Sequence, residues 1–208
     1  MGQAQDRRSA ARALTEAGRF FFARGWVPAT SGNFSARLSA DEALLTVSGR
    51  HKGHLDPEAD FLRVDLDGRS LDADRRPSAE TELHTTLYRR DAGIGAVLHT
   101  HSPHATVLSQ LTRGGDLELA EYEVLKAFPG IATHSASVRV PVFDNDQDIT
   151  RLAAAVAARM DAAGLGVGYL IAGHGCYTWG ETVADAVRHV EALEFLFECE
   201  LLKRGLVR

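Results

Sequence analysis

The chain has 208 residues, of which 45% are hydrophobic and 25% are charged. These values are typical of globular proteins, and they predict one domain, 1–208, with a single substantial core. Lys and Arg number 23 against 28 Asp and Glu, which gives a formal net charge of −5, and the basic residues form no stripe. We therefore expect no nucleic-acid partner.

Cysteine usage and hydropathy indicate the compartment. The only cysteines are Cys176 and Cys199, and the segment before Phe20 lacks an apolar core followed by a small-residue cleavage site. The longest apolar runs, such as Val167 to Ala172, are much shorter than the roughly 20 residues that span a bilayer. We therefore expect a reduced, cytoplasmic protein that is not inserted in a membrane.

The first half of the chain predicts two helices separated by short strands. Apolar residues recur at helical spacing over 6–24, and Gly25 is a stop signal. Ser78 has the position of an N-cap for a helix that runs to about Arg90. Between these helices, Gly- and Asn-containing turns, including Ser48-Gly49 and Asp67-Gly68, separate three expected strands, at 31–38, 43–47 and 61–65.

The second half mixes strands and helices without a strict alternation. Expected strands lie at 95–100, 138–143, 168–172 and 176–179, and expected helices begin at Pro103 and cover about 147–163 and 181–203. Several of the strands in the chain are joined by short turns, which favour antiparallel pairing. We predict an α/β fold of three layers (αβα), with a central, mostly antiparallel sheet covered by helices.

Histidines at the end of an expected strand are the strongest chemical signal. His99 and His101 are two residues apart, so their rings point to the same face of a strand. Catalytic zinc typically has three protein ligands and one open position, and His174, between two glycines after an apolar strand, is the best third candidate. Two histidines on a half-exposed strand are also an ordinary arrangement. His104, on the first turn of an expected helix and close to the pair, is an intermediate case. We favour a surface or hydrogen-bonded role for the remaining histidines, which are His51, His54, His84, His134 and His189.

Small-residue turns could hold a phosphate group. They are Ser31-Gly32-Asn33, Ser48-Gly49 with Lys52 nearby, and Pro77-Ser78-Ala79 at an expected helix start. Backbone N–H groups in such turns can face an anion, although each turn alone is common loop chemistry. A proton-transferring carboxylate is also needed if a metal ion activates a sugar, and residue types alone leave four candidates: Glu80, Glu82, Glu121 and Glu123.

The order of these motifs resembles the class II aldolase and adducin-like family across nearly the whole chain. Five motifs carry the resemblance, namely Thr30-Ser31-Gly32-Asn33, Ser48-Gly49, Pro77-Ser78-Ala79-Glu80, His99-Thr100-His101 and Gly173-His174-Gly175. Within the family, the segments 47–53, 99–102, 123–126 and 174–181 are most similar to the dehydratases that act on a phosphorylated methylthio-pentulose in methionine salvage.

The resemblance implies a set of roles. It implies one Zn²⁺ per subunit on His99, His101 and His174, and Glu123 as the acid/base, with Glu80, which has this role in the aldolases, as a secondary candidate. It also implies a class II aldolase-like fold and a homotetramer with active sites at subunit boundaries. The implied contacts to the phosphorylated sugar are Gly32, Asn33, Ser48, Gly49, Lys52 and Ser78.

The implied reaction is the conversion of 5-methylthioribulose 1-phosphate to its 2,3-diketo product. Glu123 would take the C3 proton, and the same group, now protonated, would assist departure of the C4 hydroxyl as water. A sugar-phosphate aldolase or 4-epimerase of the fuculose or ribulose phosphate type is the alternative, because it shares the same motifs. A non-catalytic, adducin-like interaction domain is the alternative of another class.

Overall fold

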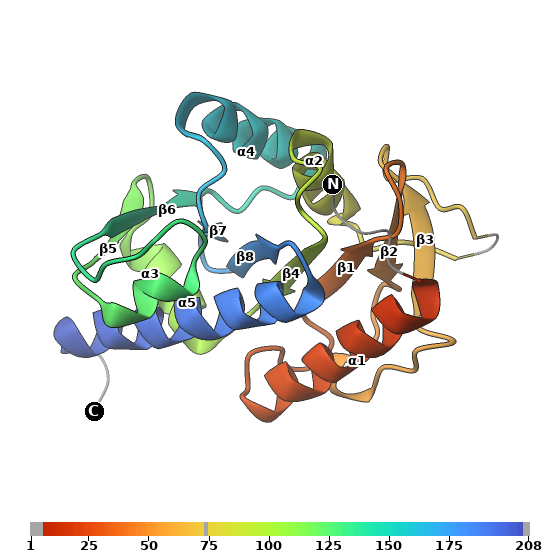
Figure 1. Cartoon of the computed structure of the whole chain (residues 1–208), viewed down its shortest axis with the longest axis horizontal. Helices are drawn as coiled ribbons and strands as arrows, with labels where there is room; N and C mark the ends of the chain where they lie inside the picture. Colours follow the sequence, from red (N-terminus) through yellow and green to blue (C-terminus); the bar gives the residue numbers. More distant parts are fainter. Residues whose placement is uncertain (1–5, 73–74, 206–208) are drawn as a thin grey trace.

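A central sheet lies between two layers of helices in the computed structural model, which describes residues 6–72 and 75–205 (Figure 1). The sheet has eight strands in the order β3-β2-β1-β4-β8-β7-β6-β5. Every neighbouring pair is antiparallel except β6 and β7, which are parallel. The predicted three-layer fold with a mostly antiparallel sheet is confirmed.

The strands are short, as the frequent turn signals indicate. They are β1 (Asn33–Arg37), β2 (Glu42–Thr46), β3 (Phe61–Asp65), β4 (Ala96–Thr100), β5 (Asp116–Ala120), β6 (Ser137–Phe143), β7 (Gly168–Ile171) and β8 (Gly175–Gly180). The edge strand β5 was absent from the sequence prediction. It is recognised only through its pairing with β6, where Leu117 and Leu119 point into the core between polar residues.

The helices cover the two faces of the sheet unequally. α1 (Arg7–Ala23), α3 (Pro103–Leu111) and α5 (Val183–Lys203) lie along one face, and α2 (Thr81–Arg90) and α4 (Ile149–Ala163) along the other (Figure 1). Two short 3₁₀ helices, η1 (Lys52–His54) and η2 (Glu123–Ala127), lie in connections. Among the described residues, no helix is long and apolar enough to cross a bilayer.

Three apolar clusters make up the core. One joins α1 and the first half of α5 to β1, β2 and β4, and a second joins α2 and α4 to the opposite face of the sheet. A third lies between α3, the second half of α5 and strands β5 to β8. Alternating residues of β4 separate the first two clusters, since Leu98 belongs to one and Val97 to the other. His99 therefore points to the same side as Val97, toward α2 and α4.

The start of α2 differs from the sequence prediction. The helix begins at Thr81 with Glu80 in the N-cap position, and the Glu80 side chain makes no capping hydrogen bond. Ser78 is therefore not the N-cap: its carbonyl accepts from the Thr81 N–H in a turn before the helix, and its hydroxyl oxygen accepts from the Asn33 side chain. Because neither side chain caps the helix, those of Ser78 and Glu80 both extend toward Asn33 and the end of β4.

Candidate metal centre and cavity

Three imidazoles meet where β4 ends and the β7–β8 turn begins. His99 is the penultimate residue of β4, His101 follows the strand, and His174 lies in the turn between β7 and β8. The Nε2 atom of His99 is 2.8 Å from that of His101 and 3.3 Å from that of His174. The side chains of His99 and His101 therefore lie on the same side of the sheet, as their two-residue spacing predicts.

Close backbone approach explains the glycine after His174. A Cβ atom on Gly175 would lie 2.0 Å from the carbonyl oxygen of Thr100, because β8 pairs with β4 at this point. Only glycine permits this approach without displacement of one strand. The local register therefore brings His174 to His99, although 75 residues separate them in the chain.

A hydrogen bond behind His99 fixes its tautomer. Nδ1 of His99 lies 3.0 Å from the carbonyl oxygen of Cys176 and therefore carries the proton that it donates, which leaves a lone pair on Nε2. The His99 ring is fully buried and stacks on Tyr177, with 4.0 Å between the ring centroids. This packing holds the ring in one orientation.

The environment keeps the imidazoles of His99 and His101 neutral. Burial, followed by the neighbouring His101 and His174, lowers the pKa of His99 well below its usual value. Burial also lowers the pKa of His101 to about 3. Three side chains whose ligand atoms all lie within 4.8 Å of one another can thus present lone pairs to one cation. Neutral imidazoles are good ligands for a divalent metal ion, so these residues fit such an ion.

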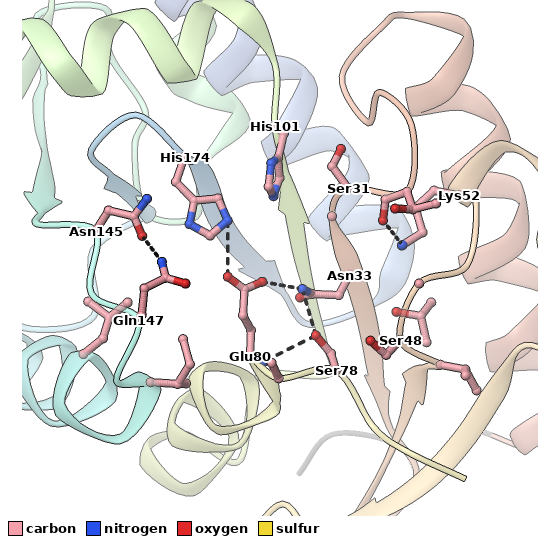
Figure 2. Close-up of a pocket in the computed structure, with 18 of the residues that line it drawn as sticks. Ser31, Asn33, Ser48, Lys52, Ser78, Glu80, His101, Asn145, Gln147 and His174 are labelled. Carbon is pink, nitrogen blue, oxygen red and sulfur yellow. Dashed lines mark hydrogen bonds and ion pairs between the residues drawn. The ribbon is translucent and has the colours of Figure 1, made fainter.

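A carboxylate faces the same point from α2. Oε1 of Glu80 is 3.2 Å from Nε2 of His174 (Figure 2). Oε2 of Glu80 is 3.5 Å from Nε2 of His99. Oε2 also accepts a hydrogen bond of 2.6 Å from Nδ2 of Asn33. Glu80 thus brings a carboxylate into contact with His99 and His174.

A cavity of about 410 Å³ opens in front of the histidines and contains most of the predicted contacts. His101, His174 and Glu80 line it on one side (Figure 2). The three small-residue turns converge on it, which the sequence could not show; they contribute Ser31, Gly32, Asn33, Ser48, Gly49, Ser78 and Ala79.

Lys52 lines the cavity, but its ammonium group is already engaged. Nζ donates to the carbonyl oxygens of Thr30 at 2.8 Å and of Arg50 at 2.6 Å, and the side chain is 2% exposed. Burial is the main cause that lowers the pKa of Lys52 to about 8. Lys52 therefore joins the two turns that flank the cavity.

The remaining wall comes from a segment that the sequence analysis did not select. Asn145, Asp146 and Gln147, in the connection between β6 and α4, line the cavity together with the apolar residues Val47, Ile149 and Leu152 (Figure 2). These three polar residues directly follow the strand expected at 138–143, and that position was the one sign of a functional role in the sequence. Polar residues are common in loops, so this sign is weak.

Glu123 lies elsewhere in its own chain. It begins η2, is exposed, and forms an ion pair of 2.6 Å with Lys126, which lowers the pKa of its carboxyl group. It does not line the cavity. Of the other two candidates, Glu121 is exposed and has a positive φ of 63°, and Glu82 accepts a hydrogen bond from Thr150. Neither lines the cavity.

Comparisons with known proteins place the chain in a family. Residues 12–201 match the family model described as Class II Aldolase and Adducin N-terminal domain, so the chain belongs to that family. It is 59% identical, over 93% of its length and 95% of the relative, to methylthioribulose-1-phosphate dehydratase from Pseudomonas savastanoi pv. phaseolicola. It is also 59% identical, over 94% of both chains, to the protein of the same name from Azotobacter vinelandii.

Solved structures show the same fold. L-fuculose-1-phosphate aldolase from Thermus thermophilus is similar with a TM-score of 0.75 and 29% identity, over 96% of this chain and 95% of the aldolase. A sugar-phosphate aldolase from Thermotoga maritima, at 19% identity and a TM-score of 0.70 over 97% of both chains, has the same fold. The predicted class II aldolase-like fold is therefore confirmed.

Proposed function

We propose that this chain is a zinc-dependent methylthioribulose-1-phosphate dehydratase, the hydro-lyase of methionine salvage. The observation that carries the proposal is an identity of 57–59% along nearly the whole chain to relatives with that name. The site supports it, since the ligand atoms of three histidines lie within 4.8 Å of one another beside a cavity that His101 and His174 line. The cavity is large enough for a phosphorylated pentulose.

We assign the metal ion to His99, His101 and His174. Their imidazole donors and their single shared face toward a cavity are typical of catalytic zinc, which keeps one position open. When bound, zinc supplies a Lewis acid that polarises the substrate oxygens and stabilises developing negative charge. The Cys176 carbonyl orients His99 for this role.

We assign the phosphate group to the small-residue turns of the cavity. Gly32, Ser48, Gly49 and Ser78 can offer backbone N–H groups and hydroxyls to an anion. Asn33 and Lys52 have side chains that are already hydrogen-bonded within the protein, so they hold the turns in place. The buried charge of Lys52 also favours a phosphate nearby.

We assign the main proton transfer to Glu123, and this assignment requires a second copy of the chain. Glu123 is exposed and lies outside the cavity of its own subunit, so it must enter the cavity of a neighbour. A homotetramer with active sites between subunits, as the resemblance implies, would provide this arrangement. Exposed large apolar side chains suit such an assembly; they include Phe22, Val107, Leu111, Phe195 and Leu202.

The proposed reaction moves one proton and releases one water molecule. The Glu123 carboxylate removes the C3 proton of 5-methylthioribulose 1-phosphate. Its protonated form then donates to the C4 hydroxyl, which leaves as water, and the resulting enol tautomerises to the 2,3-diketo product. Glu80, in contact with His99 and His174, is the secondary acid/base and the alternative proton carrier.

We place this enzyme in the cytoplasm, where both free thiols stay reduced.

A sugar-phosphate aldolase is the second candidate. Two observations agree with it: Glu80 lies beside the histidines, and the fold is similar to that of fuculose-1-phosphate aldolase.

A substrate assay distinguishes the candidates. The purified protein is incubated with methylthioribulose 1-phosphate, and diketone formation is followed by mass spectrometry. A diketone that forms only with metal present supports the dehydratase. Release of dihydroxyacetone phosphate or glycolaldehyde phosphate instead would establish an aldolase. A wild-type protein that binds no metal when zinc is supplied and turns over neither kind of substrate would favour an interaction domain.

A further inference from the structure

A buried polar network lies behind Glu80 and connects α2 to β1. Glu80, His84 and Tyr88 are spaced four residues apart, so they lie on one stripe at the start of α2 and along it. Asn33 and Ser35 are two apart on β1 and face that stripe. His84, Ser35, Tyr88 and Asn33 are each at most 5% exposed.

The hydrogen bonds of this network run in sequence from Tyr88 to Glu80. The Tyr88 hydroxyl is 2.7 Å from Oγ of Ser35, and that oxygen is 2.8 Å from Nδ1 of His84. Nε2 of His84 contacts Oδ1 of Asn33. Nδ2 of Asn33 then donates to Oε2 of Glu80 at 2.6 Å.

The chemistry of the groups fixes the direction of each bond. Oε2 of Glu80 accepts from the NH₂ group of Asn33, so the amide oxygen Oδ1 of Asn33 faces His84 and needs a donor there. His84 must then carry its proton on Nε2, which leaves Nδ1 as an acceptor for the Ser35 hydroxyl. Ser35 in turn accepts from Tyr88. With any other tautomer of His84, two acceptors would face each other in a buried site.

We propose that His84 is a positioning residue, which holds the Asn33 amide in the one orientation that aims Glu80 at the metal-site histidines. This inference rests on the proposed function, because it takes the orientation of Glu80 to matter for dehydration. His84 itself lies behind Asn33 and does not line the cavity. The sequence predicts a surface or hydrogen-bonded role for this histidine, and its contacts with Ser35 and Asn33 agree with the hydrogen-bonded alternative.

The first test does not depend on activity. Ring ¹⁵N chemical shifts of the intact protein report which nitrogen of a histidine carries the proton. The proposal requires the Nε2–H tautomer for His84 in the wild type, and also in Ser35→Ala, because Oδ1 of Asn33 still needs a donor after Nδ1 has lost its own. A wild-type His84 in the Nδ1–H or doubly protonated form would overturn the proposal.

The second test measures turnover. His84→Leu removes the donor to Asn33, and we expect kcat to fall about 10- to 100-fold, the usual cost of removing an outer partner, with KM and bound metal nearly unchanged. His84→Gln retains an N–H at a similar reach and should restore most of kcat. Ser35→Ala, which keeps the histidine, should lower kcat in the same direction and serves if His84→Leu does not fold.

A matched control separates positioning from general loss of packing. His189 is also buried, at 3% exposure, and hydrogen-bonds to the Trp179 carbonyl away from the cavity. His189→Leu should lower stability but leave kcat per folded molecule unchanged. Equal kcat in His84→Leu and wild type, or equal losses in the Leu and Gln variants of His84, would contradict the proposal. A wild-type enzyme that does not dehydrate the substrate would refute the proposed function alone, because the tautomer test still stands.

Discussion

Gly175 passes so close to Thr100 that any side chain would meet the Thr100 carbonyl oxygen, 2.0 Å from the position of a Cβ atom. This contact lies where β4 and β8 pair, between His99 on one strand and His174 beside the other. The shape of the candidate metal site therefore depends on backbone packing as well as on the histidines themselves.

Gly175→Ala should separate the strands at the metal site. We expect the free energy of unfolding to fall by about 1–3 kcal/mol, the usual cost of overpacking, and metal affinity to fall because His174 moves away from His99. Urea unfolding and metal titration measure both effects. Gly115→Ala is the matched control, because its Cβ would have 3.7 Å to the nearest atom. Equal stability of the two variants would refute this account.

Replacement of His99 and His101 by alanine should remove bound metal and dehydratase activity together. The double variant leaves His174 as the one histidine of the site, and a single imidazole binds a divalent ion weakly. Metal content by mass spectrometry and turnover of the substrate are measured on the same preparation. The exposed His54 provides the control: His54→Ala should retain both. Full metal occupancy in the double variant would place the ion elsewhere.

Mixing two inactive variants tests whether Glu123 acts across a subunit boundary. His99→Ala chains keep Glu123, and Glu123→Gln chains keep the three histidines. If each site takes its histidines and its carboxylate from different subunits, random assembly at equal amounts should restore about a quarter of wild-type activity. The mixture is refolded together and assayed, with each variant refolded alone as the control.

The outcome of the mixing experiment also decides between the two glutamates. No recovery from the mixture, with tetramers shown by light scattering, would place all catalytic groups in one subunit and favour Glu80. Substantial activity of Glu123→Gln alone would lead to the same conclusion. Loss of activity with retained metal in Glu123→Gln, together with recovery on mixing, would support Glu123.

Lys52 should make stability depend on pH in the alkaline range. Burial lowers its pKa from 10.5 to about 8 in the folded protein, so the unfolded chain binds more protons between these values. The burial cost is fully present below about pH 8 and disappears as pH rises to 10.5, so this contribution makes the protein more stable by on the order of 3 kcal/mol over that window.

The Lys52 contribution is measured as a difference between two proteins. Unfolding free energies of wild type and Lys52→Met are compared at several pH values, so that other titrating groups cancel. The difference should change in favour of wild type between pH 8 and 10.5. A difference that does not vary with pH would show that folding does not lower the pKa of Lys52.

The sequence by itself determined much of the local structure and the candidate metal ligands. Helical periodicity located the helices to within a few residues, and alternation located most strands, because both patterns are local. The two-residue spacing of His99 and His101 is likewise local, and the ordered motifs supplied His174. The edge strand β5 was missed, since only its pairing with β6 shows it to be a strand.

Only the tertiary structure decided which polar groups meet. Glu80, Glu82, Glu121 and Glu123 are equivalent as residue types, but only Glu80 contacts the histidines within one chain. His84 looked ordinary because its partners, Asn33 and Ser35, lie about 50 residues away on β1. Such contacts depend on how strands pair and helices pack, and those long-range arrangements leave no periodic pattern in the sequence.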